Sequence, residues 1–572
     1  MTNAESVTGL SQKLKTIFRI LDWLPRYKLS FLSMDLIAGI TLASFVLPES
    51  LAYANLAGVP PQYGIYCIIA GGLLFAIFTS TKQVVIGPTS AISLMVGSTI
   101  ALMADGDLQR WAAIASLTAL VIFVLCIISY LLHLSSLVSF ISESILLGFK
   151  AGAAITIIST QLPKLFGIHI SGTNFFSRIA NLSNHLNEMH LTVFLFGLAA
   201  FIILRLGQHF FSGWPVSLIV VIVAICLISF TGLSQQGFEL LGLLPNGLPP
   251  LGRPSLRFTD VDGILGLALG CFLMGYVETM AAAKTFAEKH NYNVNARQEL
   301  LALGFANFGA ALASGFPVAG GLSQSTVNDK SGAKTPLALI FCSFALVIIL
   351  LYFTHLIQNL PEVVLAAVVI DAVMGLIKVK SLKQLYNLSK PEFLVALIAV
   401  AGVLTFGILK GVLIASLISI VFVIAKSKMP YIAVLGKIPG TLRFSDIKRN
   451  PDNTEITSIR ILRVESSIVY YNEENVHELL LSHTLWGADK IRLVILDLSA
   501  ASNIDVSGAH MLLKFSTELK EQNIQFKIVE ALATARDMLR KLGLEEITGH
   551  ISRRDSIENE VEEFQKLQTA SK

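Results

Sequence analysis

The stretch "GFPVAGGLSQSTVN", residues 315–328, interrupts an apolar part of the chain with glycines and a proline and continues with small polar residues. Glycine and proline break helices, so we expect the backbone to unwind here and a new helix to begin near Ser323. The first N–H groups of that helix have no partner within it. Its N-terminus is therefore predicted to attract an anion.

An earlier stretch, "VIGPTSAISLMVG" at residues 85–97, repeats this design, because Gly87 and Pro88 precede Thr89 and Ser90. One such stretch alone is more typical of a kink or a re-entrant turn, where small residues let helices pack closely. Two of them, in separate halves of a membrane protein, indicate a binding site near the bilayer midplane. We therefore expect the two helix N-termini to face each other across an anion.

The composition indicates a polytopic membrane protein. The 572 residues are 53% hydrophobic and only 14% charged, with a mean hydropathy of +0.68. A membrane-spanning helix needs about 20 apolar residues, so the apolar runs suffice for about ten to fourteen spans. Residues 1–35 carry several basic side chains and no signal peptide, which predicts a cytoplasmic N-terminus.

The charge pattern argues against a nucleic-acid partner. The formal net charge is +4, but the lysines and arginines are spread over many short connections and form no single basic patch. They recur at alternate connections, as the positive-inside rule expects for cytoplasmic loops. The five cysteines lie in apolar runs without metal-ligand spacing, so we expect buried thiols and no metal site.

The C-terminal part reads as a soluble domain. Residues 454–471 and 491–499 have the pattern of strands, and residues 508–522 have helical spacing, which together predict a small α/β domain. The expected organisation is a cytoplasmic segment at 1–35, a transmembrane domain at 36–428, a linker at 429–444, the α/β domain at 445–560 and a tail at 561–572.

The motif "LDLSAASNIDVSG", residues 496–508, resembles the signature of the STAS domain, which occurs in anti-sigma-factor antagonists and at the C-terminus of SulP anion transporters. In the antagonists, the serine that corresponds to Ser507 is phosphorylated, which makes Ser507 a candidate regulatory site. A plainer interpretation is a capped turn in which Asp505 or Ser507 satisfies free N–H groups at the start of a helix.

The membrane region resembles the SulP family, which is related to prestin and pendrin. The motifs that carry the resemblance are "LPESLAYANLAGVPPQYGIY" (47–66), "ISESILLGFKAGAAITIISTQLPKLFG" (141–167), "LLPNGLPPL" (243–251) and residues 278–328. The resemblance implies fourteen segments in two inverted repeats of seven, as in the uracil permease fold, divided into a mobile core and a gate. It also implies a homodimer, with the anion bound between the half-helices of the third and tenth segments.

The predicted anion-binding residues follow from the two glycine-rich stretches and from the first span: Thr89, Ser90, Ser323, Gln324, Ser325 and Tyr53. Tyr53 lies one helical turn after Glu49, and packing is an equally good interpretation of it. Many exchangers of the family have an arginine where this chain has Gln324. The expected site has therefore lost a cation.

Two carboxyls are the predicted proton-coupling residues. Glu49 stands where the family usually has a glutamine, and Glu278 matches an acidic position that the family uses in cation coupling. Ionised carboxyls are costly within a membrane, so such residues are functional candidates by default. The sodium site of a cyanobacterial bicarbonate transporter has a threonine where this chain has Ala282. Asp371 and Glu299 are expected near the ends of segments, outside the site.

The sequence thus predicts a secondary active transporter of a small inorganic anion, with sulfate favoured and a proton as the coupled ion. Sodium-coupled bicarbonate uptake, anion exchange and dicarboxylate transport remain alternatives. A membrane sensor or scaffold that signals to a cytoplasmic partner through the STAS domain is an alternative of another class. No nucleotide-binding loop, catalytic triad or zinc spacing is found, so we expect neither an enzyme nor a cofactor. The expected location is a bacterial inner membrane.

Overall fold

A computed structural model of the chain describes residues 17–101, 103–104, 107–134, 143–170, 172, 174–211, 215–231, 237–242, 247–248, 261–484, 491–552 and 554–570. Most of the motif at 243–251, the first sixteen residues of the predicted N-terminal segment and the last two residues of the predicted tail lie outside this description. The chain divides into two compact units, residues 1–419 and 420–572. Each unit is described by itself.

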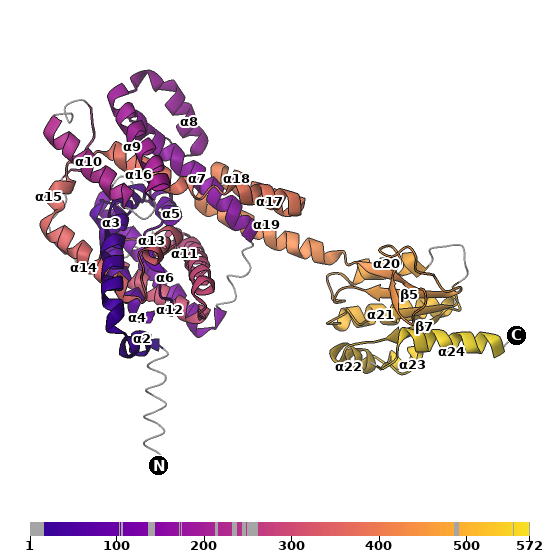
Figure 1. The fold of residues 1–572 in the computed structure, drawn as a ribbon. Helices are drawn as coiled ribbons and strands as arrows, with labels where there is room; N and C mark the ends of the chain where they lie inside the picture. The colour runs from indigo at the N-terminus through magenta and orange to yellow at the C-terminus, as the bar shows by residue number, and fades with distance from the viewer. Residues whose placement is uncertain are drawn as a thin grey trace, which may run out of the picture. The chain divides into compact units, whose positions relative to one another are not determined.

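The first unit is a helical bundle whose elements come in the same order twice (Figure 1). In each series, two helices precede a three-residue strand with its short helix, and four further helices follow. The first series is α3 (Leu32–Leu56), α4 (Gln62–Phe78), β1 (Val85–Gly87) with α5 (Ser90–Ile100), α6 (Leu108–Leu131), α7 (Glu143–Phe166), α9 (Leu191–Phe210) and α10 (Val216–Thr231). The second is α11 (Val261–His290), α12 (Ala296–Leu312), β2 (Ala319–Gly321) with α13 (Leu322–Lys330), α14 (Leu337–Tyr352), α16 (Glu362–Met374), α18 (Lys390–Phe406) and α19 (Ile408–Lys428).

Shorter elements connect these segments. They are α2 (Ile20–Trp23), α8 (Phe175–Asn184), α15 (Thr354–Ile357) and α17 (Val379–Leu388), with 3-10 turns at Leu24–Arg26, Leu29–Phe31 and Leu186–Glu188. The repeated order confirms the predicted class of a polytopic helical membrane protein. It also explains why the chain can build two similar half-helices from segments far apart in sequence.

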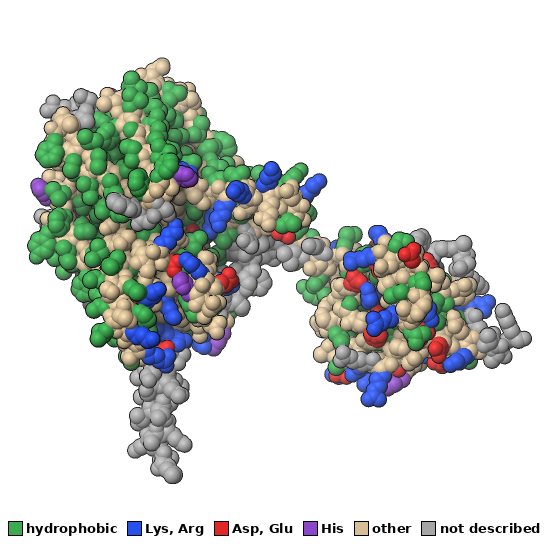
Figure 2. Space-filling view, viewed as in Figure 1, with side chains coloured by type: hydrophobic (Ala, Val, Ile, Leu, Met, Phe, Trp, Pro, Cys, Tyr) green, Lys and Arg blue, Asp and Glu red, His purple; other side chains and the backbone are tan. Residues whose placement is uncertain are grey.

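The surface of this unit suits a hydrocarbon environment. Among the described helices, α3, α6, α7, α9 and α11 are long and apolar enough to cross a membrane, and several shorter helices are also apolar. Large hydrophobic side chains cover much of the visible surface of the bundle (Figure 2). Examples on lipid-facing helices are Phe210 at 71%, Phe230 at 86% and Phe344 at 61% exposure. In water, such an exposed apolar surface would cause aggregation, whereas in a membrane it contacts lipid tails.

The helices of the bundle pack in two groups. One, which we call the core group, contains α3, α4, α5, α6, α11, α12, α13 and α14, with α12 lying against α4 and α6 and α14 lying against α3. The other, the gate group, contains α7, α9, α10, α16 and α18, with α16 lying against α7 and α9 and α18 lying against α7. The two groups meet where α16 and α10 contact α3. Both half-helices belong to the core group.

The second unit is an α/β domain with helices on both faces of a five-stranded sheet. The strands lie in the order β4 (Phe444–Asp446), β3 (Ile432–Lys437), β5 (Ile459–Val464), β6 (Leu493–Asp497) and β7 (Gln525–Val529). Strands β5, β6 and β7 are parallel, and β3 is antiparallel to both β4 and β5. The helices are α20 (Glu473–Thr484), α21 (Val506–Glu521), α22 (Ala533–Lys541), α23 (Glu545–Thr548) and α24 (Ile557–Ala570).

The structure corrects the predicted boundaries of this domain. Residues 429–444, predicted as a linker, contain β3, whose register with β5 pairs Ile432 with Val464. The predicted tail, from residue 561, starts inside α24, whose Ile557 and Val561 help to bury one face of the sheet. The sequence hid β3 because this short strand follows α19 almost directly and has no polar loop before it.

We expect β3 to be essential for the stability of the soluble domain. A fragment of residues 429–572 should unfold cooperatively in urea, whereas a fragment of residues 445–572 should unfold at a clearly lower urea concentration. The shorter fragment loses the buried side chains of Ile432 and Leu435, each worth about 1.5–3 kcal/mol, and exposes the edge of β5. Far-UV circular dichroism would measure both transitions, and equal midpoints would show that β3 is dispensable.

Candidate functional site

The two half-helices are joined by a short antiparallel ladder. Strand β1 pairs with β2 so that Val85 lies opposite Gly321 and Gly87 lies opposite Ala319. Each strand leads directly into its half-helix, and antiparallel strands run in opposite directions. Helices α5 and α13 therefore continue from opposite ends of the ladder, and the ladder lies between their N-terminal ends. Both glycine-rich stretches thus interrupt the helical structure and precede a short helix, and an anion between the two helices stays a prediction.

Side chains of the core group hold the ladder in place. The Thr279 hydroxyl accepts a hydrogen bond from the Gly320 N–H at 2.8 Å and donates one to the Gly275 carbonyl at 2.6 Å. A Cβ atom on Gly320 would lie 2.8 Å from the Cα atom of Thr279, so only glycine allows this approach. These contacts fix β2 against α11 and thereby place the neighbouring Glu278 beside the half-helices.

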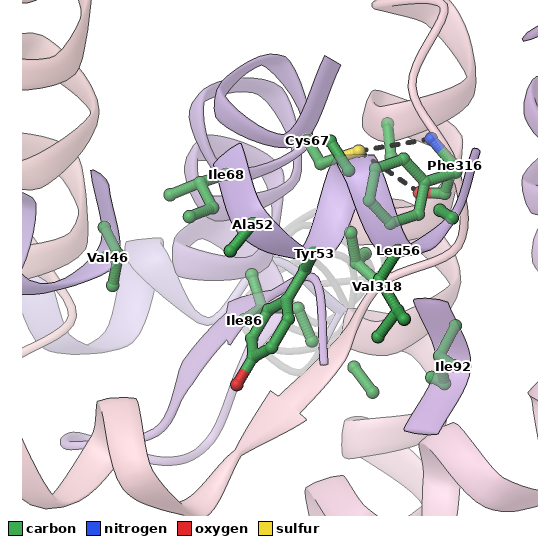
Figure 3. Close-up of a cluster of buried hydrophobic side chains, with 14 of the residues drawn as sticks. Val46, Ala52, Tyr53, Leu56, Cys67, Ile68, Ile86, Ile92, Phe316 and Val318 are labelled. Atoms are coloured by element: carbon green, nitrogen blue, oxygen red, sulfur yellow. Dashed lines mark hydrogen bonds between the residues drawn. The ribbon is translucent and has the colours of Figure 1, made fainter. Parts of the chain in front are cut away.

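The chain before β2 is also anchored within the apolar interior. The amide group of Asn307 pairs with both the N–H and the carbonyl of Val318, at 3.0 and 3.1 Å. The Cys67 thiol contacts the backbone N–H and carbonyl of Phe316 (Figure 3). Backbone groups left without a helical partner are costly in a membrane, and these side chains satisfy them.

Glu278 is linked to the start of α5. The Thr89 hydroxyl donates a hydrogen bond to the Glu278 carboxylate at 3.0 Å. Thr89 is the N-cap residue of α5, but its side chain makes no capping bond to that helix. Glu278 also interacts electrostatically with Lys150 of α7. The Thr89 hydroxyl, which in this position would ordinarily accept a capping bond from the helix, instead donates a hydrogen bond to Glu278.

Glu49 is linked to the start of α13. The Gln324 side-chain amide donates to the Glu49 carboxylate at 3.2 Å and to the Pro88 carbonyl at 3.3 Å. Glu49 is only 4% exposed, and Gln324 is buried. The carbonyl oxygen of the Gln324 side chain is buried without a hydrogen-bond partner among the described residues. Each predicted coupling acid therefore contacts the N-terminal end of one half-helix.

Tyr53 and Ser90 complete the side of the site nearest α3. Tyr53 is buried, and its hydroxyl lies near Ser90, the buried first residue of α5. In Figure 3 its ring lies beside Ile86, and the hydroxyl points away from the apolar cluster. The structure thus brings Tyr53, Ser90, Thr89 and Gln324 close together, and their binding of an anion stays a prediction.

The two serines of α13 have different roles in the structure. Ser323 is exposed at the second position of the helix, at the end where the free N–H groups lie. The hydroxyl of Ser325 accepts a bond from the Val85 N–H at 2.9 Å and donates to the Gly321 carbonyl at 2.6 Å. A hydroxyl has one proton to donate, so in this conformation Ser325 holds the ladder together and has no proton left for an anion.

Two residues near the site were not predicted. The Ser93 hydroxyl, on the first turn of α5, is buried without a hydrogen-bond partner among the described residues. Asp371 lies in the last turn of α16, near a segment end as expected, but it is buried there and pairs with Arg205 at 3.4 Å. Helix α16 packs on α3, which carries Glu49 and Tyr53, so the gate group also presents an acid on the side of α3. Only the packing of α16 on α3 reveals this proximity, since the residues are far apart in sequence.

Ser507 lies in a separate place, in the soluble domain. It is the second residue of α21 and lines a pocket of about 530 Å³ with Glu473, His477, His510 and Lys514 among others. The N-cap is Asp505, whose carboxylate accepts from the Gly508 N–H at 2.9 Å. The capping interpretation of the motif is therefore correct for Asp505, and the Ser507 hydroxyl is left half-exposed at the pocket.

We expect Thr279 to be a structural requirement for the ladder. Thr279→Val should lower the free energy of unfolding by about 1–3 kcal/mol, because the buried Gly320 N–H loses its acceptor. Thr279→Ser should restore most of the loss. Thr285→Val is a matched control, since this threonine lies on the same helix and makes only an exposed bond to Ala281. Thermal unfolding in detergent would measure all three variants, and a Thr279→Val protein as stable as the control would contradict the assignment.

Comparisons with known proteins identify the family of both units. The sulfate permease family matches residues 32–399, and the STAS domain matches residues 450–563. A probable sulfate transporter of Mycobacterium tuberculosis is 29% identical over 91% of this chain and 92% of its own length. The chloroplastic sulfate transporter 4.1 of Arabidopsis thaliana is 30% identical over 93% of this chain and 80% of its own length.

Solved structures show the same fold. The overall structure of SLC26A9 covers 99% of this chain and 95% of its own, with a TM-score of 0.89 and 20% identity. The transmembrane domain of a cyanobacterium bicarbonate transporter, BicA, covers 69% of this chain and 98% of its own, with a TM-score of 0.60 and 22% identity. The chain belongs to the sulfate permease family of membrane transporters and carries a C-terminal STAS domain.

Proposed function

We propose that the protein is a secondary active transporter that carries a small inorganic anion, with sulfate favoured, together with a proton. The observation that carries this proposal is the pairing of each half-helix with one acid. Thr89 at the start of α5 binds Glu278, and Gln324 at the start of α13 binds Glu49. The N-termini of α5 and α13 supply positive potential for the anion, and the two carboxyls supply proton-binding groups beside it.

The charge balance of the site favours proton coupling. Gln324 is neutral, so the anion and two ionised carboxylates would repel one another in a medium of low dielectric constant. Protonation of Glu278 removes one of these charges. It also weakens the hydrogen bond that Thr89 donates to Glu278, because a neutral carboxyl is a poorer acceptor than a carboxylate, and the hydroxyl can then donate to the anion instead. Proton binding and anion binding thereby support each other.

The relatives support the choice of anion. The two curated relatives described above are named sulfate transporters, and the fold places this chain near a bicarbonate transporter as well. Helix N-termini recognise charge and hydrogen-bond acceptors, which sulfate and bicarbonate share. Sodium-coupled bicarbonate uptake and anion exchange are therefore the alternatives. At the position where the sodium site of the cyanobacterial bicarbonate transporter has a threonine, Ala282 is fully buried and has no side-chain oxygen to bind sodium.

The proposed setting is a bacterial inner membrane, with a homodimer whose N-termini and STAS domains face the cytoplasm. The basic connections, such as the lysines around α17, support this orientation. The STAS domain would act on assembly or transport rate, because the described anion-site residues all belong to the first unit. The pocket beside Ser507 is the candidate place for a cytoplasmic partner or for phosphorylation.

We expect Ser323 to contact the anion. Ser323→Trp should abolish sulfate binding while the protein stays folded, because the side chain would fill the exposed end of α13. Ser323→Ala, which keeps the space and removes only the hydroxyl, should weaken binding by roughly tenfold, the value of one hydrogen bond to a charged group. Isothermal titration of purified protein with sulfate would measure both, and normal affinity in Ser323→Trp would exclude this site.

We expect Glu278 to couple transport to the proton gradient. Glu278→Gln resembles the protonated carboxyl, so sulfate exchange should persist in part while accumulation driven by an inward pH gradient disappears. Glu288→Gln is the matched control, since it makes the same change at an exposed position of the same helix. Uptake of labelled sulfate into proteoliposomes, with pH and sodium gradients imposed separately, is the measurement. Wild-type uptake that follows sodium and ignores pH would favour the sodium-coupled alternative.

A further inference from the structure

A lysine joins the two helix groups at one end of the bundle. The ammonium group of Lys164, in the last turn of α7, donates a hydrogen bond to the side-chain carbonyl of Asn55 at 2.8 Å. It also pairs with the carboxylate of Glu362, the first residue of α16, at 2.9 Å. Helices α7 and α16 belong to the gate group, and α3, which carries Asn55, belongs to the core group. The hydrogen bond therefore crosses from the gate group to the core group, whereas the ion pair stays within the gate group.

Asn55 reports directly on the position of the anion site. It lies in the last turn of α3, two residues after Tyr53, and the same helix carries Glu49. A movement of the core group that displaces Glu49 and Tyr53 along or away from the gate must also displace Asn55. Such a movement would stretch or break the bond to Lys164. The bond is thus placed to oppose opening of the bundle at the end where α3 and α7 finish.

The surroundings of Lys164 allow the bond to be broken repeatedly. The residue lines a cavity of about 800 Å³ in the gate group, together with Glu362, His169, Arg178 and Glu239 among others. The side chains of Lys164 and Glu362 are 29% and 25% exposed, so water can replace a lost partner. A partly exposed contact of this kind is weak, which suits an interaction that is made and broken in each transport cycle.

The unequal partners decide where the lysine goes when the groups separate. Glu362 offers a full negative charge, whereas Asn55 offers a neutral carbonyl, so the bond to Asn55 is the one more easily exchanged for water. Lys164 would stay with Glu362 on the gate group, already positioned to bind Asn55 again when the core group returns. The ion pair with Glu362 keeps Lys164 on the gate group, and the hydrogen bond to Asn55 is the contact that breaks when the groups separate.

We propose that Lys164 is a latch between Asn55 and Glu362 that holds this end of the bundle closed during the transport cycle. With the orientation proposed above, this is the extracellular end, because α3 begins on the cytoplasmic side and finishes here. The latch rests on the proposed transport function in that it presumes movement of the core group against the gate group. It assigns no role in anion recognition to Lys164.

Accessibility of the anion site from outside tests the latch. A cysteine introduced at Ser323 reports on the start of α13, in a background where the exposed native cysteine is removed by Cys226→Ser. Intact cells or right-side-out vesicles would be treated with a membrane-impermeant maleimide added only outside. Lys164→Met should raise the labelling rate roughly two- to fivefold, as expected for loss of one weak contact. Asn55→Asp should lower it, because the latch becomes an ion pair.

A matched control changes a different polar side chain of the same cavity. His169→Gln changes a strongly exposed side chain that pairs with Glu239 within the gate group, so external labelling should be unchanged. Glu362→Gln should also raise the labelling rate, but less than Lys164→Met does. The variant removes the ion pair that positions Lys164 and leaves the hydrogen bond to Asn55 in place. Thermal unfolding in detergent checks that each variant is folded.

The opposite effects of Lys164→Met and Asn55→Asp keep the proposal falsifiable even if one variant is unstable. Labelling that is unchanged in both variants, or that changes in the same direction in both, would overturn the latch. The outcome is separate from that of the proposed function, because labelling requires neither sulfate nor a proton gradient. A wild-type protein that failed to accumulate sulfate but showed the two opposite labelling shifts would refute the coupling and retain the latch.

Discussion

The antiparallel pairing of β1 with β2 is the constraint on which the rest of the membrane domain depends. Two backbone segments leave helical structure in the middle of an apolar bundle, where water cannot satisfy their polar groups. Three residue pairs of ladder, with Thr279, Asn307 and Cys67 around them, supply the missing partners. The same ladder sets the directions of α5 and α13. The anion site is therefore a consequence of how the break in the helices is satisfied.

Around this ladder, polar side chains divide into those that hold the backbone and those that remain available. The Thr279 hydroxyl donates its proton to the Gly275 carbonyl, and the Ser325 hydroxyl donates its proton to the Gly321 carbonyl. Thr89 instead donates to Glu278, and Gln324 donates to Glu49, so these bonds change whenever an acid gains a proton. The proposed coupling would thus depend on bonds between side chains, while the shape of the proposed site depends on bonds to the backbone.

The division into core and gate groups gives distant residues a shared role. Both half-helices and both coupling acids are on the core group, whereas Asp371, Lys150 and Lys164 are on the gate group. The gate group places charged side chains near the acids of the core group, since Lys150 is on α7, which contacts α5, and Asp371 is on α16, which contacts α3. Relative movement of the two groups would change these interactions. The electrostatic environment of the acids is therefore tied to the conformation of the bundle.

Sequence alone determined the membrane class, the two interrupted segments and the presence of an α/β domain, because hydropathy, glycine and proline placement and strand alternation are local properties. It also identified Glu49 and Glu278, since acids within apolar runs stand out by composition. The start of the soluble domain was placed too late, because β3 is a short strand whose membership of the sheet depends on pairing with β5. Local pattern could not separate such a strand from a linker.

The partners of each side chain were decided only by the tertiary structure. Ser323 and Ser325 are two residues apart and look equivalent in the sequence, yet one is exposed and the other locks the ladder to Val85. The contacts of Gln324 with Glu49, of Asp371 with Arg205 and of Lys164 with Asn55 join segments far apart along the chain. Composition and periodicity indicate the chemical type of a residue and the secondary structure of the segment that contains it. Which element lies opposite depends on the packing of the whole bundle, and that packing determines which polar groups are free to act.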